Sequence, residues 1–284
     1  MPQTVSGWAE RAWIGLIQVA PLRAYTRLIR VVSGIPLPRK LRGPIFGGIG
    51  QRMGMDLSEA AGELSEYRCF AELFARSLRD GLRPVEQTAE VLVSPVDGAV
   101  SGMGQISQDS LIQAKGIHYP LSELVASPPL ARALDGGTYL TLYLQPSDYH
   151  RIHAPVAGRV VRMTRVSGSL FPVKPYAVRG VHGLYVRNER VVFELATPLG
   201  PLAMVCVAAA GVGNITTRYD GVALGPDAVL DAPVEKGEEM ARFNLGSTVI
   251  VVCPAGAVEL RPLSPGQHVR MGQRVADVRV APKP

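Results

Sequence analysis

Three short segments of the chain concentrate side chains that can move protons or attack a carbonyl carbon. They are Ser94-Pro-Val-Asp97-Gly98, Asp148-Tyr-His150-Arg-Ile-His153 and Gly246-Ser247-Thr248. Together they supply a carboxylate, two imidazoles and a hydroxyl, which are the parts of a nucleophile, its base and a group that orients the base. The sequence therefore indicates chemistry at a serine, provided that the fold brings the three segments together.

Each segment also has an ordinary explanation when it stands alone. Asp97 before a glycine is typical of a turn, and a Gly-Ser pair ahead of a valine-rich run commonly begins a strand. His150 and His153 would belong to a metal site only with a third ligand, and none lies at suitable spacing. The cysteines are far apart and form no CxxC pair, which predicts neither a zinc site nor a disulfide framework. We therefore expect no metal, and a reducing compartment fits the cysteine content.

Two regions of different character have to position these segments. Residues 7–83 repeat apolar side chains at helical spacing, whereas the chain beyond Pro84 alternates short valine-rich runs with Gly and Pro. The runs predicted as strands are 90–93, 138–144, 191–195, 204–207 and 248–252. We predict an α+β fold, with a helical region over residues 1–88 and a strand-dominated catalytic domain over residues 89–284.

Two internal echoes indicate that the β region folds back on itself. Residues 95–100 are similar to 155–160, and residues 234–241 are similar to 269–276. Their glycine turns resemble those of the small β-sandwich that carries lipoyl or biotinyl groups. The carrier lysine of those modules has no evident counterpart here, so this lipoyl-like character concerns architecture only.

The N-terminal region contains a basic amphipathic helix. On a helical wheel, arginines occupy one face and apolar side chains the opposite one: Arg23, Arg27 and Arg30 against Tyr25, Leu28, Ile29 and Val32. Trp8 and Trp13 are side chains that favour a boundary between lipid and water, and the net charge of +6 favours an anionic partner. A surface helix that packs its apolar face on the core is the alternative. We expect no spanning helix, because no run of about 18 apolar residues is uninterrupted by charge.

The three reactive segments belong to six motifs that match phosphatidylserine decarboxylases in order and approximate spacing. The resemblance runs from about residue 65 to residue 252, and the residues before it are similar only in being helical, basic and amphipathic. The matched motifs are Tyr67-Arg-Cys-Phe70-Ala-Glu-Leu-Phe74 through Arg83-Pro84, Ser94 to Gly98, Gln113-Ala-Lys115-Gly116, Asp148 to His153, Arg187-Asn-Glu-Arg190-Val and Phe243-Asn-Leu-Gly-Ser247-Thr-Val-Ile.

The resemblance implies an inactive precursor whose cofactor is made from the chain itself. The chain would cut itself between Gly246 and Ser247 into a β chain, residues 1–246, and an α chain, residues 247–284, which form a heterodimer. Ser247 would become a pyruvoyl group, the covalent cofactor, whose ketone forms a Schiff base with the amine of phosphatidylserine. The products would be phosphatidylethanolamine and CO₂, and neither pyridoxal phosphate nor a metal is required.

The same resemblance assigns roles to the other reactive side chains. It makes His153 the base and Asp97 the carboxylate that orients it, a charge relay acting on the backbone at Ser247. His150 takes the position that assists decarboxylation or reprotonation. If both histidines lay on one strand, their odd separation would point them to opposite faces, so a turn is needed for both to reach one site.

An anionic lipid substrate also accounts for the basic helix. We therefore expect a peripheral protein on the cytoplasmic side of the cell membrane, with anionic phospholipid as a partner and no nucleic acid, while a homo-oligomer is left open. Two alternatives stand beside this interpretation. A serine hydrolase would use Ser247, His153 and Asp97 on external esters, although the Gly-x-Ser-x-Gly elbow is missing. A non-catalytic lipoyl-like module tethered to the membrane would leave the three reactive motifs without a purpose.

Overall fold

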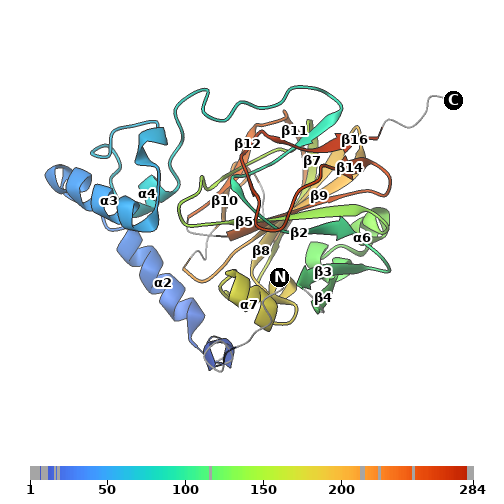
Figure 1. Cartoon of the computed structure of the whole chain (residues 1–284), viewed down its shortest axis with the longest axis horizontal. Coiled ribbons are helices and arrows are strands. Elements are labelled where there is room, and N and C mark those ends of the chain that lie inside the picture. The colour runs from blue at the N-terminus through green and yellow to red at the C-terminus, as the bar shows by residue number, and fades with distance from the viewer. Residues whose placement is uncertain are drawn as a thin grey trace.

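The computed structural model describes residues 7, 12–15, 17, 20–114, 117–211, 215–222, 225–244 and 247–279. Within these residues a helical arm comes first in the chain and stands to one side of a strand-rich body (Figure 1). Strands dominate the body, and short helices lie between them in the chain. The arrangement confirms the predicted α+β class.

The helices of the arm change direction at a tight turn. They are α2 (Leu22–Ser33), α3 (Arg39–Met53), the 3-10 turn η1 (Leu57–Glu59) and α4 (Phe70–Phe74). Gly54 ends α3 with a φ of 71°, a left-handed conformation that suits glycine, and the Asp56 carboxylate caps η1 by accepting from the Ser58 N–H. The short helices of the body are α5 (Leu121–Val125), α6 (Pro128–Leu134), α7 (Pro175–Gly180) and α8 (Leu184–Arg187).

Every run predicted as a strand lies within or overlaps an observed strand. The strands are β1 (Val91–Val93), β2 (Gly98–Gln105), β3 (Ser110–Ala114), β4 (Ile117–Pro120), β5 (Thr138–Leu144), β6 (Arg151–His153), β7 (Gly158–Val166), β8 (Arg190–Thr197), β9 (Gly200–Val207), β10 (Ile215–Thr217), β11 (Asp227–Val234), β12 (Glu239–Phe243), β13 (Ser247–Cys253), β14 (Val258–Leu260), β15 (His268–Val269) and β16 (Arg274–Val278). Their paired neighbours run antiparallel.

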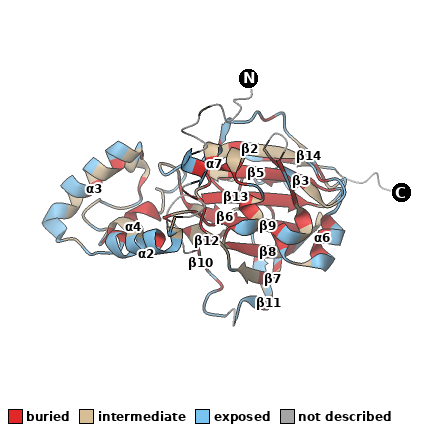
Figure 2. Cartoon of the chain, turned by 90° about the horizontal axis from the view of Figure 1, so that it is seen from below, coloured by how far each residue is buried: buried red, intermediate tan, exposed pale blue. Residues whose placement is uncertain are grey.

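The largest sheet has the strand order β11-β7-β8-β9-β13-β5-β2-β15. Smaller sheets have the orders β1-β16-β14 and β10-β12-β6, and β3 pairs with β4. β13 lies between β9 and β5, and every one of its residues is buried, as Figure 2 shows for the centre of the body. A strand covered on both faces carries a continuous apolar run, which explains the valine-rich sequence after Ser247.

The two sequence echoes are also related in space. Ser94 exchanges backbone hydrogen bonds of 2.8 and 2.9 Å with the 269–276 segment. Ala154, at the equivalent position of the second echo, makes the same two bonds with the 234–241 segment at 2.9 and 2.8 Å. Each turn of one pair is therefore held by a turn of the other pair. This arrangement places the turn that carries Asp97 next to the end of β6.

Helix α2 contacts the body through polar groups, among them the Thr26 hydroxyl. Thr26 and Ser33 are its buried residues, and the Thr26 hydroxyl accepts a hydrogen bond of 3.0 Å from the Gly211 N–H. Leu28 and Val31, by contrast, are 60% and 61% exposed. The apolar face thus stays at the surface, and the alternative in which it packs on the core is wrong. Among the described residues, none of the helices has the length and apolar character that crossing a membrane requires.

Candidate active site

Ser247 is the first residue of β13 and is fully buried. It pairs in register with Leu144 at the end of β5. Within the described part of the chain its Oγ has no hydrogen-bond partner, which is costly for a buried hydroxyl and typical of a functional position. Leu245 and Gly246, and with them the predicted cleavage site, lie outside the described residues.

His150 lies just before β6 and outside the strand. The two histidines are therefore not both on one strand, the arrangement that would have pointed them to opposite faces. The His150 Nδ1 donates to the Asp148 carbonyl at 2.8 Å, so Nε2 carries the lone pair, and Nε2 has no partner among the described residues. The ring packs 4.2 Å from that of Phe74, and burial lowers the pKa of His150 to about 3. His150 is therefore a neutral imidazole with a bare basic nitrogen.

The chain ties His150 to the strand that leads to Ser247. The Phe243 N–H, at the end of β12, donates to the His150 carbonyl at 2.9 Å. Residues 244–246 then connect β12 to β13. The β5–β6 loop contacts the residues on both sides of this connection, since Leu144 pairs with Ser247 and the His150 carbonyl accepts from the Phe243 N–H. The serine and the imidazole thus flank the same short stretch of chain.

His153 is buried, and both of its ring nitrogens have partners. Nδ1 donates to the Gly237 carbonyl at 2.8 Å, and Nε2 accepts from the Tyr149 hydroxyl at 3.0 Å. Burial lowers the pKa of His153 below its ordinary value, so this imidazole is also neutral. Its basic nitrogen faces Tyr149, a residue of the same sequence motif that the sequence analysis did not single out.

Asp97 is held by an arginine. The Arg83 Nε lies 2.9 Å from both carboxylate oxygens, Arg83 Nη2 lies 2.6 Å from Oδ2, and the Met271 N–H donates to Oδ1 at 2.8 Å. Arg83 also binds Glu59 at 2.8 Å. Burial alone would lower the pKa of Arg83, yet the hydrogen bonds to Asp97 and Glu59 raise it above its ordinary value.

The structure brings Asp97 and His153 together without joining their side chains. The His153 N–H donates to the Pro95 carbonyl at 2.9 Å, which places β6 against the turn that carries Asp97. No hydrogen bond links the two side chains in this part of the described structure, because each has other partners. Sequence reasoning missed Arg83, although the Arg-Pro pair at the end of the first matched motif was the available signal.

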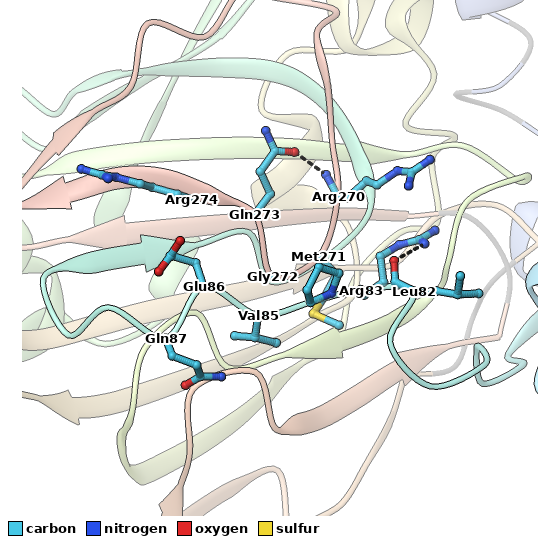
Figure 3. Close-up of a pocket in the computed structure, with 11 residues that line it drawn as sticks. Leu82, Arg83, Val85, Glu86, Gln87, Arg270, Met271, Gly272, Gln273 and Arg274 are labelled. Carbon is cyan, nitrogen blue, oxygen red and sulfur yellow. Dashed lines mark hydrogen bonds between the residues drawn. The ribbon is translucent and has the colours of Figure 1, made fainter.

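Two hollows adjoin these residues. Arg83 and Met271 line a hollow of about 630 Å³ between the 82–87 and 270–274 segments. Figure 3 shows the side chains that line it. The other, of about 190 Å³, lies between α2 and the end of β5. Its lining is largely apolar and includes Tyr25, Ile29, Phe74, Tyr143, Leu144 and Lys174. Leu144, which lines this second hollow, pairs in register with Ser247.

Two further matched motifs have structural roles. The Gln113 side chain is buried and bonds the Val178 and Val181 carbonyls and the Leu184 N–H, which fastens β3 to α7 and α8. Arg190 likewise donates to the Glu123 and Leu124 carbonyls of α5. Lys115 and Gly116 of the Gln113 motif lie outside the described residues. Gln113 and Arg190 therefore stabilise the packing of the short helices on the body.

The described residues thus hold a buried serine hydroxyl that has no partner among them, two neutral imidazoles on the 150–153 segment, and a carboxylate bound by Arg83, which are the side chains of a serine and histidine site. A family model described as phosphatidylserine decarboxylase matches residues 70–277. The chain therefore belongs to the phosphatidylserine decarboxylase family.

Relatives aligned along nearly the whole chain support this membership. Chains named phosphatidylserine decarboxylase proenzyme from Anaeromyxobacter sp. (strain K), Methylibium petroleiphilum and Halorhodospira halophila are 42%, 45% and 41% identical to this chain. The alignments cover 93%, 94% and 98% of this chain, and 97%, 98% and 98% of those relatives. The resemblance seen in the sequence is thereby confirmed.

Proposed function

We propose that this protein decarboxylates phosphatidylserine to phosphatidylethanolamine, with a pyruvoyl group formed when the chain cuts itself between Gly246 and Ser247. The observation that carries the proposal is the Ser247 hydroxyl, fully buried and without a partner in the described structure, in a chain of this family. A hydroxyl in that state is not needed for packing or for hydrogen bonding. It is available for attack on the preceding carbonyl.

The self-cleavage can be written with all atoms in balance. Ser247 Oγ adds to the Gly246 carbonyl and gives up its proton to a base, and the peptide C–N bond breaks to leave an ester and a free amine. A base then removes the Ser247 Cα proton, and the Cβ–Oγ bond breaks with its electron pair on the oxygen. The products are a carboxylate at Gly246 and a dehydroalanine at residue 247. One water replaces one ammonia at that residue to leave the pyruvoyl ketone.

The residues present fit a pyruvoyl group, because it is encoded by Ser247 and needs no separate binding pocket. When formed, it supplies a ketone that condenses with the serine amine of the lipid and an adjacent amide that withdraws electrons as CO₂ leaves. β13 would hold the group at the buried end of the sheet. His150, with its bare Nε2, is suited to exchanging a proton with a carbon centre there.

We assign the self-cleavage relay to Asp97, His153 and Ser247. The neutral state of His153 supports its role as the base, as does the Nδ1–H tautomer, in which Nε2 is the basic nitrogen and accepts a hydrogen bond from the Tyr149 hydroxyl. The Gly237 carbonyl orients the imidazole, and Asp97 acts on it through its charge. The bare Nε2 of His150 would favour the reverse assignment of the two histidines, and the His150→Ala and His153→Ala variants separate the two assignments.

Intact mass spectrometry combined with a lipid assay tests the proposed function. We expect two chains, 1–246 and 247–284, with the smaller one blocked at its N-terminus, and release of CO₂ from vesicles that contain phosphatidylserine. A serine hydrolase would give one intact chain that cleaves external esters, and a lipoyl-like module would give one intact, inactive chain. The paired turns of the two echoes support a lipoyl-like architecture for the catalytic domain 89–284 without making it a carrier.

We also propose that the helical region 1–88 holds the protein at an anionic membrane on the cytoplasmic side. Large apolar side chains are exposed along the arm, among them Trp13, Leu28, Val31, Val32 and Ile35, although Trp8 lies outside the described residues. An apolar hollow of about 400 Å³ opens between α2 and α3, and Tyr25 and Ile29 of α2 also line the hollow that contains Leu144, the register partner of Ser247. Lipid contact at the arm would therefore bring substrate to that hollow.

Replacing the exposed apolar residues of α2 should weaken vesicle binding. We expect Leu28→Ser with Val32→Ser to lower partitioning into phosphatidylserine vesicles by at least about tenfold, since each side chain gives up burial worth roughly 1.5–3 kcal/mol. Sedimentation with vesicles measures the effect. Val229→Ser, which changes a 74% exposed residue on β11, is the matched control and should bind as the wild type does. Equal binding of the control and the α2 variant would contradict the proposal.

A further inference from the structure

A row of charged side chains joins the helical arm to the carboxylate of the relay. It consists of Glu59 in η1, Arg83 in the segment between α4 and β1, and Asp97 in the turn before β2. These side chains are 18%, 7% and 4% exposed, respectively. Charges held this far from bulk water are weakly screened, so the position of each depends on its partner.

Both hydrogen-bonding edges of the Arg83 guanidinium are occupied by carboxylates. On one edge, Nε lies 2.9 Å from each Asp97 oxygen, and Nη2 lies 2.6 Å from Oδ2. On the other edge, Nη1 and Nη2 lie 3.1 and 2.8 Å from the two Glu59 oxygens. Nη1 also donates to the Leu82 carbonyl at 3.0 Å (Figure 3). A guanidinium bound at both edges has a fixed plane, which one ion pair alone would not give it.

The backbone around Glu59 is itself firmly held. The Arg79 N–H donates to the Glu59 carbonyl at 2.9 Å, and Ala60 forms a β-bridge with Leu78. Within the described residues, the Glu59 carboxylate makes hydrogen bonds only to Arg83. Glu59 is therefore a fixed support whose side chain serves Arg83.

Asp97 in turn takes its direction from Arg83. Its remaining hydrogen bond comes from the Met271 N–H, which donates to Oδ1 at 2.8 Å. In the proposed relay Asp97 acts on His153 through its charge, and such an effect weakens with distance. A displaced Asp97 side chain would change the charge that the imidazole meets as it takes a proton.

We propose that Glu59 is a positioning residue of the self-cleavage relay, acting through Arg83 on the Asp97 carboxylate. This inference rests on the proposed function. Without Glu59 the guanidinium loses its support at one edge and can turn away from Asp97. Arg76 also acts electrostatically on both carboxylates, but it donates to the Ser147 carbonyl and bonds neither of them. The helical arm therefore has a second role besides lipid contact, because η1 belongs to it.

The stage at which the relay acts distinguishes this role from simple stabilisation of the fold. Asp97 and His153 are needed before the cofactor exists. The loss of Glu59 should therefore slow the cutting of the precursor and leave turnover by the finished enzyme unchanged. A residue that only tethers the arm to the body would lower both rates together.

A time course of self-cleavage on the full chain tests this inference. The precursor is made by cell-free synthesis, the fraction cut is followed on a gel, and CO₂ release is divided by the amount of cut chain. We expect Glu59→Gln to be cut at least about tenfold more slowly than the wild type, as weakening of a charge-assisted hydrogen bond would cause. Its kcat per cut chain should be unchanged. Glu59→Asp keeps the charge but is shorter, and should be cut at an intermediate rate.

Glu72→Gln is the matched control, because Glu72 is another carboxylate of the arm and pairs with Arg68 at 2.9 Å. It should be cut as fast as the wild type. Equal cleavage rates of Glu59→Gln and Glu72→Gln would overturn the inference, while the two-chain product keeps the proposed function intact. A kcat per cut chain that falls in step with the cleavage rate would also overturn it. An uncut wild-type chain would overturn both. Glu59→Asp keeps the test decisive if Glu59→Gln does not fold.

Discussion

Ser247→Ala should leave a single uncut chain of 284 residues that releases no CO₂ from phosphatidylserine. Alanine lacks the oxygen that attacks Gly246, and it also lacks the atom that would become the leaving carboxylate oxygen. The substitution removes one buried oxygen that has no partner in the described structure, so the fold should tolerate it. Intact mass and a lipid decarboxylation assay measure the two consequences together.

A neighbouring residue supplies the control for this experiment. Thr248 is buried and follows Ser247 on β13, where successive side chains point to opposite faces. Thr248→Ala should therefore be cut into two chains. Normal processing of Ser247→Ala would remove the serine from the proposed chemistry altogether.

The second large effect separates His150 from His153 by the stage at which each is needed. We expect His153→Ala to remain uncut, and Asp97→Asn with it, because the relay acts before the cofactor exists. His150→Ala should be cut normally but decarboxylate about 10²- to 10⁴-fold more slowly, the usual cost of losing a positioned acid or base. Cleavage is scored by mass and turnover by CO₂ release.

His118→Ala serves as the control, since His118 is exposed on β4 and bonds only Ser110 among the described residues. It should be cut and should turn over as the wild type does. Blocked cleavage in His150→Ala with normal cleavage in His153→Ala would exchange the roles of the two histidines. The bare Nε2 of His150 would then be the base of the self-cleavage. Blocked cleavage in both would mean that the two imidazoles share one proton network.

Much of the fold could be predicted because its signals are local. The valine-rich run after Ser247 predicted a buried strand, and β13 is that strand. The 95–100 and 155–160 echoes predicted related turns, and the structure holds them by equivalent hydrogen bonds. The orientation of α2 was harder to predict, since an amphipathic pattern does not say which face meets the body. Thr26 makes that contact through its hydroxyl, which accepts from the Gly211 N–H.

The sequence by itself determined which reactive groups this protein has and the family to which it belongs. Ser247, His150, His153 and Asp97 could be identified because each lies in a short motif. Only the tertiary structure decided their partners and their protonation. Asp97 meets Arg83 and the distant Met271 N–H, and His153 is oriented by Gly237, which lies 84 residues further along the chain.

The physical reason is that hydrogen bonding and burial depend on neighbours in space. The low pKa of His150 comes first from its complete burial, which no local motif encodes. The hollow between α4 and the β10-β12-β6 sheet likewise combines Arg76, which follows α4, with Arg242 of β12, residues that the sequence keeps far apart. Local patterns specify the groups that can react, whereas the packing of remote segments fixes their charge, their tautomer and the anion that each cation can hold.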